Sequence, residues 1–239
     1  MATWITHMRI AEYFMAKYHS LNNKIFLVGS IGPDCGVPKE DWSKFLNGNT
    51  GSDCGIPNEN WSKYTPPPAV THWKLGEKKT TIDAEGFRQS YLQREKDEKY
   101  PFYLGYYLHL LTDIEWAKLY ERKKQEPLYA QGLAADDNFI WAAKKDWYGQ
   151  DHVYLQTHAD SVFHREFSKI GDFPNIYLDF YSNDAFTRQI KHITAFYSSA
   201  NEDLDRNFPF LSKEEMNDFV NSAIKTLEDA ANANGLMEI

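Results

Sequence analysis

The clearest structural signal in the chain is the segment Tyr103-Leu-Gly-Tyr-Tyr-Leu-His109-Leu-Leu-Thr-Asp113-Ile-Glu-Trp116. It carries an imidazole and a carboxylate four residues apart, and in a helix such residues project from the same face. Because the other side chains are mostly apolar or aromatic, this helix would be buried almost all round. A buried charge is costly unless it is paired or binds a metal ion. The segment therefore predicts a buried helix in which His109 and Asp113 have polar partners.

Helical patterns extend over most of the chain. Apolar residues recur at spacings of three and four, Gly, Pro, Asn and Asp separate the segments, and strand-like alternation is almost absent. A chain of 239 residues can bury one sizeable core, so we predict an all-α, single-domain helical bundle over 1–239. Ser212 and Glu215 form a capping-box pattern, and the tail at 230–239 is expected to fray. The predicted helices are 6–20, 84–97, 102–125, 135–148, 150–169, 182–199 and 212–232.

Further candidate metal ligands lie in three other places. His7 is in the first predicted helix, Asp34 lies in a glycine-rich loop after an apolar run, and His72 follows three prolines. With His109 and Asp113 they supply enough nitrogen and oxygen atoms for a pair of zinc ions with open positions. The residues alone also allow manganese or iron. A second interpretation is that His109 and Asp113 only form a hydrogen bond that ties two helices together.

Four motifs resemble, in order, those of the zinc-dependent phospholipase C family: TWITH at 3–7, GPDCG at 32–36, THW at 71–73 and YLGYYLHLLTDIEW at 103–116. This family has an all-α fold and includes the single-strand-specific zinc nucleases, and the segments at 146–152 and 174–180 are similar to small bacterial members. The resemblance implies that His72, His109 and Asp113 bind one zinc ion. It also implies that His7 binds a second ion bridged by Asp113, and that Asp34 lies next to the metal-bound water.

The chain departs from the family pattern in two places. In the secreted phospholipases the mature chain begins with a Trp whose amine and carbonyl bind zinc, whereas the nitrogen of Trp4 is in a peptide bond. The family's further His and HxxxE pair are missing after Asp113, so the number of ions is between one and three. Asp146 is our first candidate for a substitute ligand, with Asp151 and His152 as alternatives, because a carboxylate can replace an imidazole. The other interpretation is that this acidic cluster is a solvated helix end.

A tandem duplication occupies the loop at 32–64, where the order Asp-Cys-Gly-apolar-Pro occurs twice. Asp34 and Asp53 therefore compete for one place in the site, and we favour Asp34 because the apolar run before it fixes its position. Cys35 and Cys54 are equivalent positions of the two copies. We expect them to remain reduced thiols in a cytoplasmic chain, and the alternatives are a Cys35–Cys54 disulfide or a cysteine metal ligand.

Charge and hydropathy restrict the function further. The formal net charge of −8 argues against a surface for long nucleic acid, where lysine and arginine dominate affinity. No run approaches the length of a membrane span and no basic-then-apolar leader is visible, which predicts a cytoplasmic protein. We therefore predict a zinc-dependent hydrolase of phosphodiester bonds that uses a metal-activated water on a small phosphodiester or phospholipid head group. The alternatives are a nuclease-like phosphodiesterase, a metal-binding helical protein without activity, and a helical interaction domain without metal.

Overall fold

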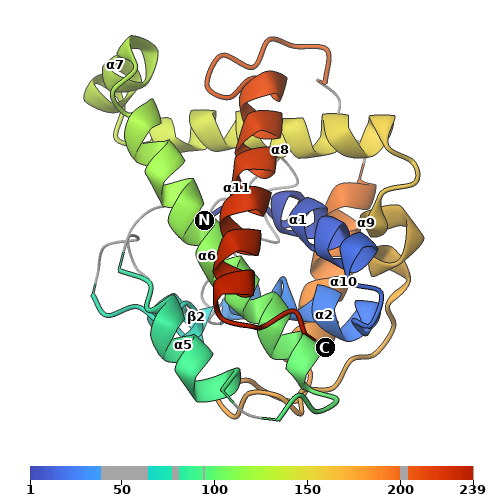
Figure 1. The fold of residues 1–239 in the computed structure, drawn as a ribbon. Helices are drawn as coiled ribbons and strands as arrows, with labels where there is room; N and C mark the ends of the chain where they lie inside the picture. Colours follow the sequence, from blue (N-terminus) through green and yellow to red (C-terminus); the bar gives the residue numbers. More distant parts are fainter. Residues whose placement is uncertain (39–63, 77–80, 94, 200–203, 239) are drawn as a thin grey trace.

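The computed structural model describes residues 1–38, 64–76, 81–93, 95–199 and 204–238. Within these ranges the protein is all-α, as predicted, with two very short strands (Figure 1). Among the helices of these ranges, none combines the length and the apolarity that crossing a bilayer requires. The α-helices are α1 (Trp4–Lys17), α2 (Asn23–Gly29), α4 (Pro68–Thr71), α5 (Ala84–Tyr91), α6 (Tyr100–Lys123), α7 (Pro127–Ala135), α8 (Phe139–Thr157), α9 (Val162–Arg165), α10 (Ala185–Ser198) and α11 (Lys213–Ala233).

Most predicted helices are present, with differences that have physical causes. Helices α1, α6, α10 and α11 match the predicted ranges to within three residues at each end. Helix α5 begins as predicted but ends at Tyr91, because residues 93–99 include no apolar side chain that packing could bury. The short helices α2 and α7 were not predicted, since a brief apolar run shows no clear periodicity.

The prediction of separate helices at 135–148 and 150–169 was wrong. One continuous helix, α8, runs through both predicted ranges, and α9 and the 3-10 helix η3 (Phe167–Lys169) follow it. Gly149 suggested a break, but it lies inside α8 where the ring of Phe208 packs against the helix. A Cβ atom at Gly149 would lie 2.4 Å from Cε1 of that ring. The glycine thus serves a close packing contact and does not end the helix.

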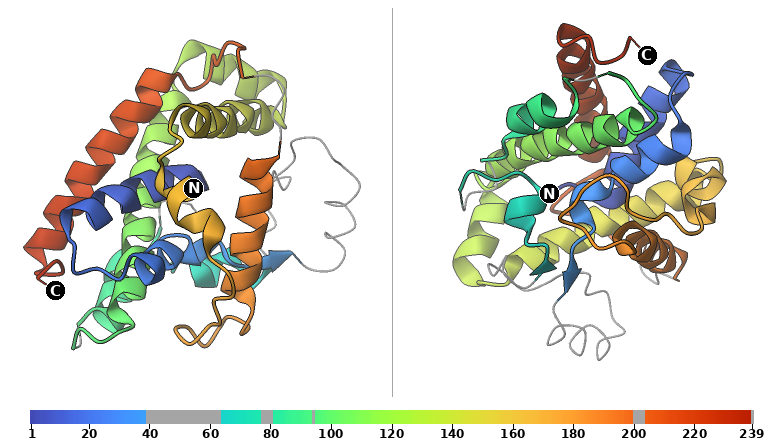
Figure 2. Two further views of the ribbon diagram at one scale, coloured as in Figure 1. Left: turned by 90° about the vertical axis from the view of Figure 1, so that its right-hand side faces the viewer. Right: turned by 90° about the horizontal axis from the view of Figure 1, so that it is seen from below.

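Helix α6 is the central element of the fold. Helices α1, α2, α5 and α11 pack against it (Figure 1), and α8 lies across one end of the bundle (Figure 2), where Trp147 contacts Trp116 of α6. Helices α2 and α6 approach so closely that only glycine fits at two positions. A Cβ atom at Gly105 would lie 2.3 Å from the carbonyl oxygen of Phe26, and one at Gly29 would lie 2.1 Å from that of Phe102. This close contact brings the residues that follow α2 next to the buried face of α6.

A strand pair closes the base of the duplicated loop. Strand β1 (Val37–Pro38) pairs antiparallel with β2 (Tyr64–Thr65), while residues 39–63 between them lie outside the described ranges. The 3-10 helix η1 (Gly32–Asp34) lies shortly before β1 in the chain, and α4 lies shortly after β2. The pairing therefore places the two flanking segments side by side, whatever the length of the loop. Loop closure entropy rises only slowly with length, so the fold tolerates a duplication here.

The C-terminal segment confirms one prediction and corrects another. The capping box is present: the Ser212 hydroxyl accepts a hydrogen bond from the backbone N–H of Glu215, and the Glu215 carboxylate accepts one from that of Ser212. The expected fraying of the tail was wrong for the described residues. Leu236 and Met237 are buried, and the hydroxyl of Tyr100 donates to the carbonyl of Leu236 at 3.0 Å. Two apolar residues just beyond the helix therefore fix the end of the chain to α6.

Candidate metal centre

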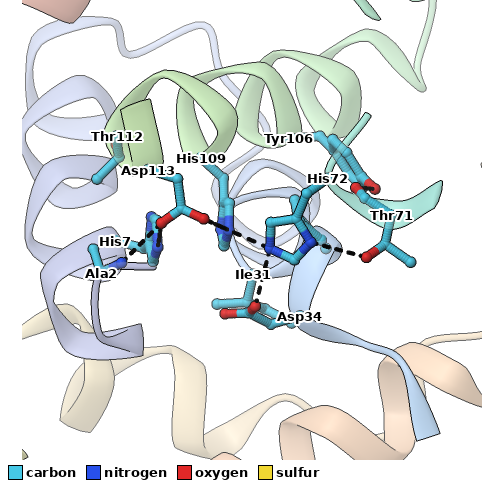
Figure 3. Close-up of polar contacts among 12 residues, drawn as sticks. Ala2, His7, Ile31, Asp34, Thr71, His72, Tyr106, His109, Thr112 and Asp113 are labelled. Atoms are coloured by element: carbon cyan, nitrogen blue, oxygen red, sulfur yellow. Dashed lines mark hydrogen bonds and ion pairs between the residues drawn. The ribbon is translucent and has the colours of Figure 1, made fainter. Parts of the chain in front are cut away.

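Five of the six predicted ligands converge in the interior, beside α6 (Figure 3). We call these five the His–Asp cluster. Asp113 lies at its centre. Its Oδ1 atom is 3.5 Å from Nε2 of His7, and its Oδ2 atom is 3.6 Å from Nε2 of His72 and 3.7 Å from Nε2 of His109. Asp34 lies at the opposite side of His72, with Oδ1 3.4 Å from Nε2. Four of the residues are at most 2% exposed, and the Asp34 side chain is 7% exposed.

Each member comes from an element that the local sequence fixes in place. His7 lies in α1, Asp34 ends η1, His72 is the C-cap of α4, and α6 presents His109 and Asp113 from one face. The four-residue spacing on α6 gives the last two a common direction, as the sequence predicts. Segments far apart in the chain thus contribute to one buried site.

Backbone and hydroxyl groups orient two of the imidazoles. Nδ1 of His109 donates to the carbonyl of Ser30 at 2.8 Å, so its Nε2 faces Asp113. Nδ1 of His72 lies 3.0 Å from the hydroxyl of Thr71. Partners of this kind fix the ring orientation of a metal-binding histidine. No sequence signal marks Ser30, because it acts through its backbone carbonyl and lies 79 residues from His109.

Asp113 also has a backbone partner from the start of the chain. Its Oδ1 atom accepts a hydrogen bond from the backbone nitrogen of Ala2 at 2.8 Å (Figure 3). This contact fixes one carboxylate oxygen, while Oδ2 faces His72 and His109. The residue therefore has a defined orientation within the cluster.

Several polar atoms of the cluster lack the hydrogen bonds that buried polar atoms normally make. Within the described part of the chain, both ring nitrogens of His7, Nε2 of His109 and Oδ2 of Asp113 are buried without a hydrogen-bond partner. Each such atom costs about 1–3 kcal/mol. The rings of His7 and His109 also stack with their centroids 3.6 Å apart, so their nitrogens do not hydrogen-bond to each other. A bound cation would satisfy the carboxylate oxygen and one nitrogen of each of these imidazoles.

The spacing of the ligand atoms suits a metal ion. One ligand atom each from His7, Asp34 and His109 lies within 4.8 Å of the others, and the same holds for His72, His109 and Asp113. Histidine nitrogens and carboxylate oxygens are ordinary zinc ligands, and several transition metals bind the same set. The residues present therefore fit a metal ion in both chemistry and spacing.

The electrostatics of the cluster act differently on its members: they favour a neutral His7 and ionised carboxylates but make His109 more basic. Burial and, to a smaller extent, the neighbouring His109 lower the pKa of His7 to about 4, so His7 is neutral at pH 7. Burial opposes ionisation of both carboxyls, yet the pKa of each is lowered. At Asp113 the charge of the amino terminus and the imidazoles of His109 and His7 outweigh burial, and at Asp34 the imidazoles of His72 and His109 do so. Burial also opposes protonation of His109, yet the nearby carboxylates of Asp113 and Asp34 and the carbonyl of Ser30 outweigh it and raise its pKa. A metal ion would then compete with a proton at His109.

The structure gives Asp146 a different role from the one predicted. Its Oδ1 accepts from Nη1 of Arg206 at 2.6 Å, and its Oδ2 accepts from the backbone nitrogen of Phe210 at 2.7 Å. Both oxygens thus have protein partners that tie α8 to the segment before α11. This pairing corrects the prediction that Asp146 replaces a missing family ligand, and equally the alternative of a solvated helix end, because the residue is buried.

The two alternatives to Asp146 are also engaged elsewhere. Asp151 accepts hydrogen bonds from the hydroxyl of Thr3 at 2.8 Å and from that of Tyr197 at 2.5 Å. The ring of His152 packs against the rings of Phe196 and Tyr197. Asp151 therefore links α8 to the start of α1 and to α10, which positions α1 and its His7.

Asp151 leads to a prediction about pH. Burial raises the pKa of Asp151 to about 7, whereas an aspartate in an unfolded chain titrates near pH 3.9. Between these values the folded state holds a proton that the unfolded state has released, so stability falls as pH rises from about 4 to 7. Asp151→Asn should remove this decline. We expect the free energy of unfolding, measured with urea at pH 5 and pH 7.5, to fall between these pH values by about 2–3 kcal/mol more in the wild type than in the variant. An equal fall in the wild type and the variant would mean that Asp151 is already ionised in the folded protein at pH 5.

The duplicated loop contributes one aspartate to the cluster within the described residues. Asp34 lies beside His72 as described above, whereas Asp53 and Cys54 lie outside the described ranges. Cys35 is a free, buried thiol whose Sγ donates to the carbonyl of Ile31 at 3.3 Å. Burial raises its pKa well above the usual range, so the thiol stays protonated and is a poor metal ligand.

The fold and the cluster define a helical protein with a buried site suited to a metal ion. The model of the zinc dependent phospholipase C family matches residues 6–234, and the chain belongs to this family. The match includes all five residues of the His–Asp cluster, and it confirms the family to which the sequence motifs pointed. No curated protein and no solved structure gives a significant match. The assignment of one domain to 1–239 stays a prediction.

Proposed function

We propose that this protein is a zinc-dependent hydrolase of phosphodiester bonds with a phospholipase C-like reaction. The observation that carries the proposal is the buried His–Asp cluster, whose unsatisfied nitrogen and oxygen atoms lie inside the segment matched by the family. His72, His109 and Asp113 would hold one ion, and His7 with Asp113 would hold a second. Zinc is chosen because the family depends on it, while manganese or iron would suit the same donors.

The residues of the chain have distinct parts in this reaction. A bound zinc ion would supply Lewis acidity toward the phosphoryl oxygens and lower the pKa of a coordinated water. Asp34 is the most exposed member of the cluster and has a lowered pKa, so it is ionised and can accept a hydrogen bond or a proton from a water molecule. The imidazoles of His72 and His109 keep the direction given by Thr71 and Ser30. The substrate would be a small phosphodiester or a phospholipid head group.

A second candidate function is a metal-binding protein without catalytic activity. It is favoured by one observation: the two carboxylates that were candidates for the missing family ligands, Asp146 and Asp151, both have protein partners. The centre would then hold fewer ions than the family pattern implies. This reading predicts tight metal binding without turnover.

Metal-dependent stability tests these readings. We expect zinc to raise the melting temperature of the chelator-stripped wild type, because metal that binds only the folded state stabilises it. His109→Ala should lose this rise and its turnover of bis-p-nitrophenyl phosphate, while His158→Ala, an exposed histidine after α8, should keep both. Differential scanning calorimetry with and without zinc, together with metal analysis, provides the measurement.

The outcomes separate the candidates. Tightly bound metal and no turnover would favour the protein without activity. No rise in melting temperature with any of zinc, manganese or iron would favour a helical interaction domain without metal. A His109→Ala variant that melts far below the stripped wild type would show that the imidazole mainly supports the core.

A further inference from the structure

Two buried tyrosine hydroxyls contact the backbone directly before two of the proposed ligands. The hydroxyl of Tyr106, on α6, donates a short hydrogen bond to the carbonyl of Thr71, the residue before His72 (Figure 3). The hydroxyl of Tyr181, in the segment before α10, donates to the carbonyl of Gly32 at 2.7 Å and lies 3.2 Å from that of Pro33. The segments at the two ends of the duplicated loop are therefore each bound by the hydroxyl group of a buried tyrosine.

The two tyrosines are themselves fixed by packing. The ring of Tyr106 stacks on Phe87 at 4.6 Å and lies against Gly32, where a Cβ atom would come within 2.6 Å of its Cδ2. The ring of Tyr181 packs against Phe186 at 5.3 Å. Both side chains are buried, at 0% and 5% exposure. Packing therefore holds each tyrosine side chain in one position.

The hydroxyls are permanent donors at the edge of the cluster. Burial raises the pKa of Tyr106 and Tyr181 well above the usual range, and the negative charge of Asp34 raises both further. Both hydroxyls are therefore protonated at neutral pH.

The supported segments have little rigidity of their own. His72 follows a helix of four residues, and Asp34 ends a 3-10 helix of three residues. Helices this short are not stable alone and depend on tertiary contacts. In contrast, His109 and Asp113 lie on a helix of 24 residues. The relative placement of the two pairs of ligands therefore depends on what ties the short segments to the framework.

We propose that Tyr106 and Tyr181 are positioning residues that set the places of His72 and Asp34 relative to the ligands on α6, and thereby the affinity and geometry of metal binding. This inference rests on the proposed function for the identity of the site. Tyr106 is the more direct of the two, because it lies one turn before His109 on α6 and so joins His72 to the helix that carries its partners. Tyr181 does the same for the turn that carries Asp34.

The test compares three conservative variants. Tyr106→Phe and Tyr181→Phe remove the two hydroxyls, and Tyr103→Phe is the matched control. The Tyr103 hydroxyl also lies on α6 and donates to a backbone carbonyl, that of Tyr177 at 2.9 Å, but this carbonyl adjoins no proposed ligand. Zinc affinity is measured by competition with a chromophoric chelator, ligand geometry by the visible absorption spectrum of the cobalt-substituted protein, and the stability of the stripped protein by urea unfolding.

We expect zinc affinity to fall about 10–100-fold in Tyr106→Phe and Tyr181→Phe, the range seen when partners that orient metal ligands are removed. Their cobalt spectra should differ from that of the wild type. Tyr103→Phe should lose comparable stability yet keep the affinity and spectrum of the wild type, because a purely structural hydroxyl does not move the ligands. Unchanged affinity and spectra in the first two variants, or an equal loss in the control, would overturn the inference.

Activity measurements keep this inference distinct from the proposed function. If the wild type binds zinc and cobalt but hydrolyses no phosphodiester, the proposed reaction fails, while the affinities and spectra still decide the positioning role. A wild type that binds neither ion would overturn both.

Discussion

Asp113→Asn is expected to abolish phosphodiester hydrolysis and to strip the protein of zinc. Asp113 faces three imidazoles at 3.5–3.7 Å, so its carboxylate can share a metal ion with each of them. An amide has no negative charge, is a poor zinc ligand, and would direct either its oxygen or its NH₂ group at each imidazole. Because loss of an indirect partner already costs about 10–100-fold in metal affinity, loss of this direct ligand should exceed 100-fold. Metal analysis after dialysis and turnover of bis-p-nitrophenyl phosphate provide the measurements.

Asp146→Asn is the matched control for this substitution. Asp146 is equally buried and is hydrogen-bonded to Arg206 and to the backbone of Phe210. Its loss should lower the free energy of unfolding while zinc content and turnover stay near those of the wild type. Normal zinc stoichiometry in Asp113→Asn would contradict the bridging role. Loss of zinc in Asp146→Asn would restore Asp146 as a ligand and contradict the structural role given to it here.

The local part of this structure could be predicted from the sequence. Helix periodicity is a short-range signal, so α6 and the shared face of His109 and Asp113 follow directly from the segment at 103–116. The order of the four motifs added His7, Asp34 and His72, and the structure brings all five residues together. The residues that lie together are therefore those whose positions helix geometry or motif order indicated, and their role as ligands stays a prediction.

The long-range part could not be predicted in this way. The partner of His109 is a backbone carbonyl, at Ser30, and any residue type could supply it. The pairing of Asp146 with Arg206 joins residues 60 positions apart, and an isolated acidic side chain in a sequence does not indicate whether its partner is a metal ion or a guanidinium. The same limit applies to Gly149, since only the packed ring of Phe208 shows why a glycine is needed inside α8.

Asp34→Asn should lower the turnover number strongly while leaving most of the zinc bound. Four other residues of the His–Asp cluster remain in this variant, and the part proposed for Asp34 is toward the water molecule. Removing a group that assists proton transfer costs about 10²–10⁴-fold in rate. Steady-state kinetics and metal analysis on the same sample separate the two effects, since a fall in rate without a loss of metal assigns the residue to the reaction step. A proportional loss of zinc would make Asp34 primarily a ligand.

The duplicated loop supplies a control within the chain. Asp53 holds the equivalent place in the second copy and lies outside the described residues. If Asp34 is the copy that serves the site, Asp53→Asn should be nearly silent in both rate and zinc content. Equal damage from the two substitutions would show that the second copy has its own role.

Deletion of one repeat unit tests the same point in the other direction. Removing Pro33 to Gly51 joins Gly32 to Ser52 and leaves Asp53 at the place that Asp34 held. The order Asp-Cys-Gly-apolar-Pro is kept, so the apolar residue and the proline of the second copy can pair with β2 as Val37 and Pro38 do now. The shorter loop costs less closure entropy, and the variant should fold and retain turnover. Adding Asp53→Asn to the deletion should then cost as much rate as Asp34→Asn does in the full chain. A folded but inactive deletion variant would show that the two copies are not interchangeable.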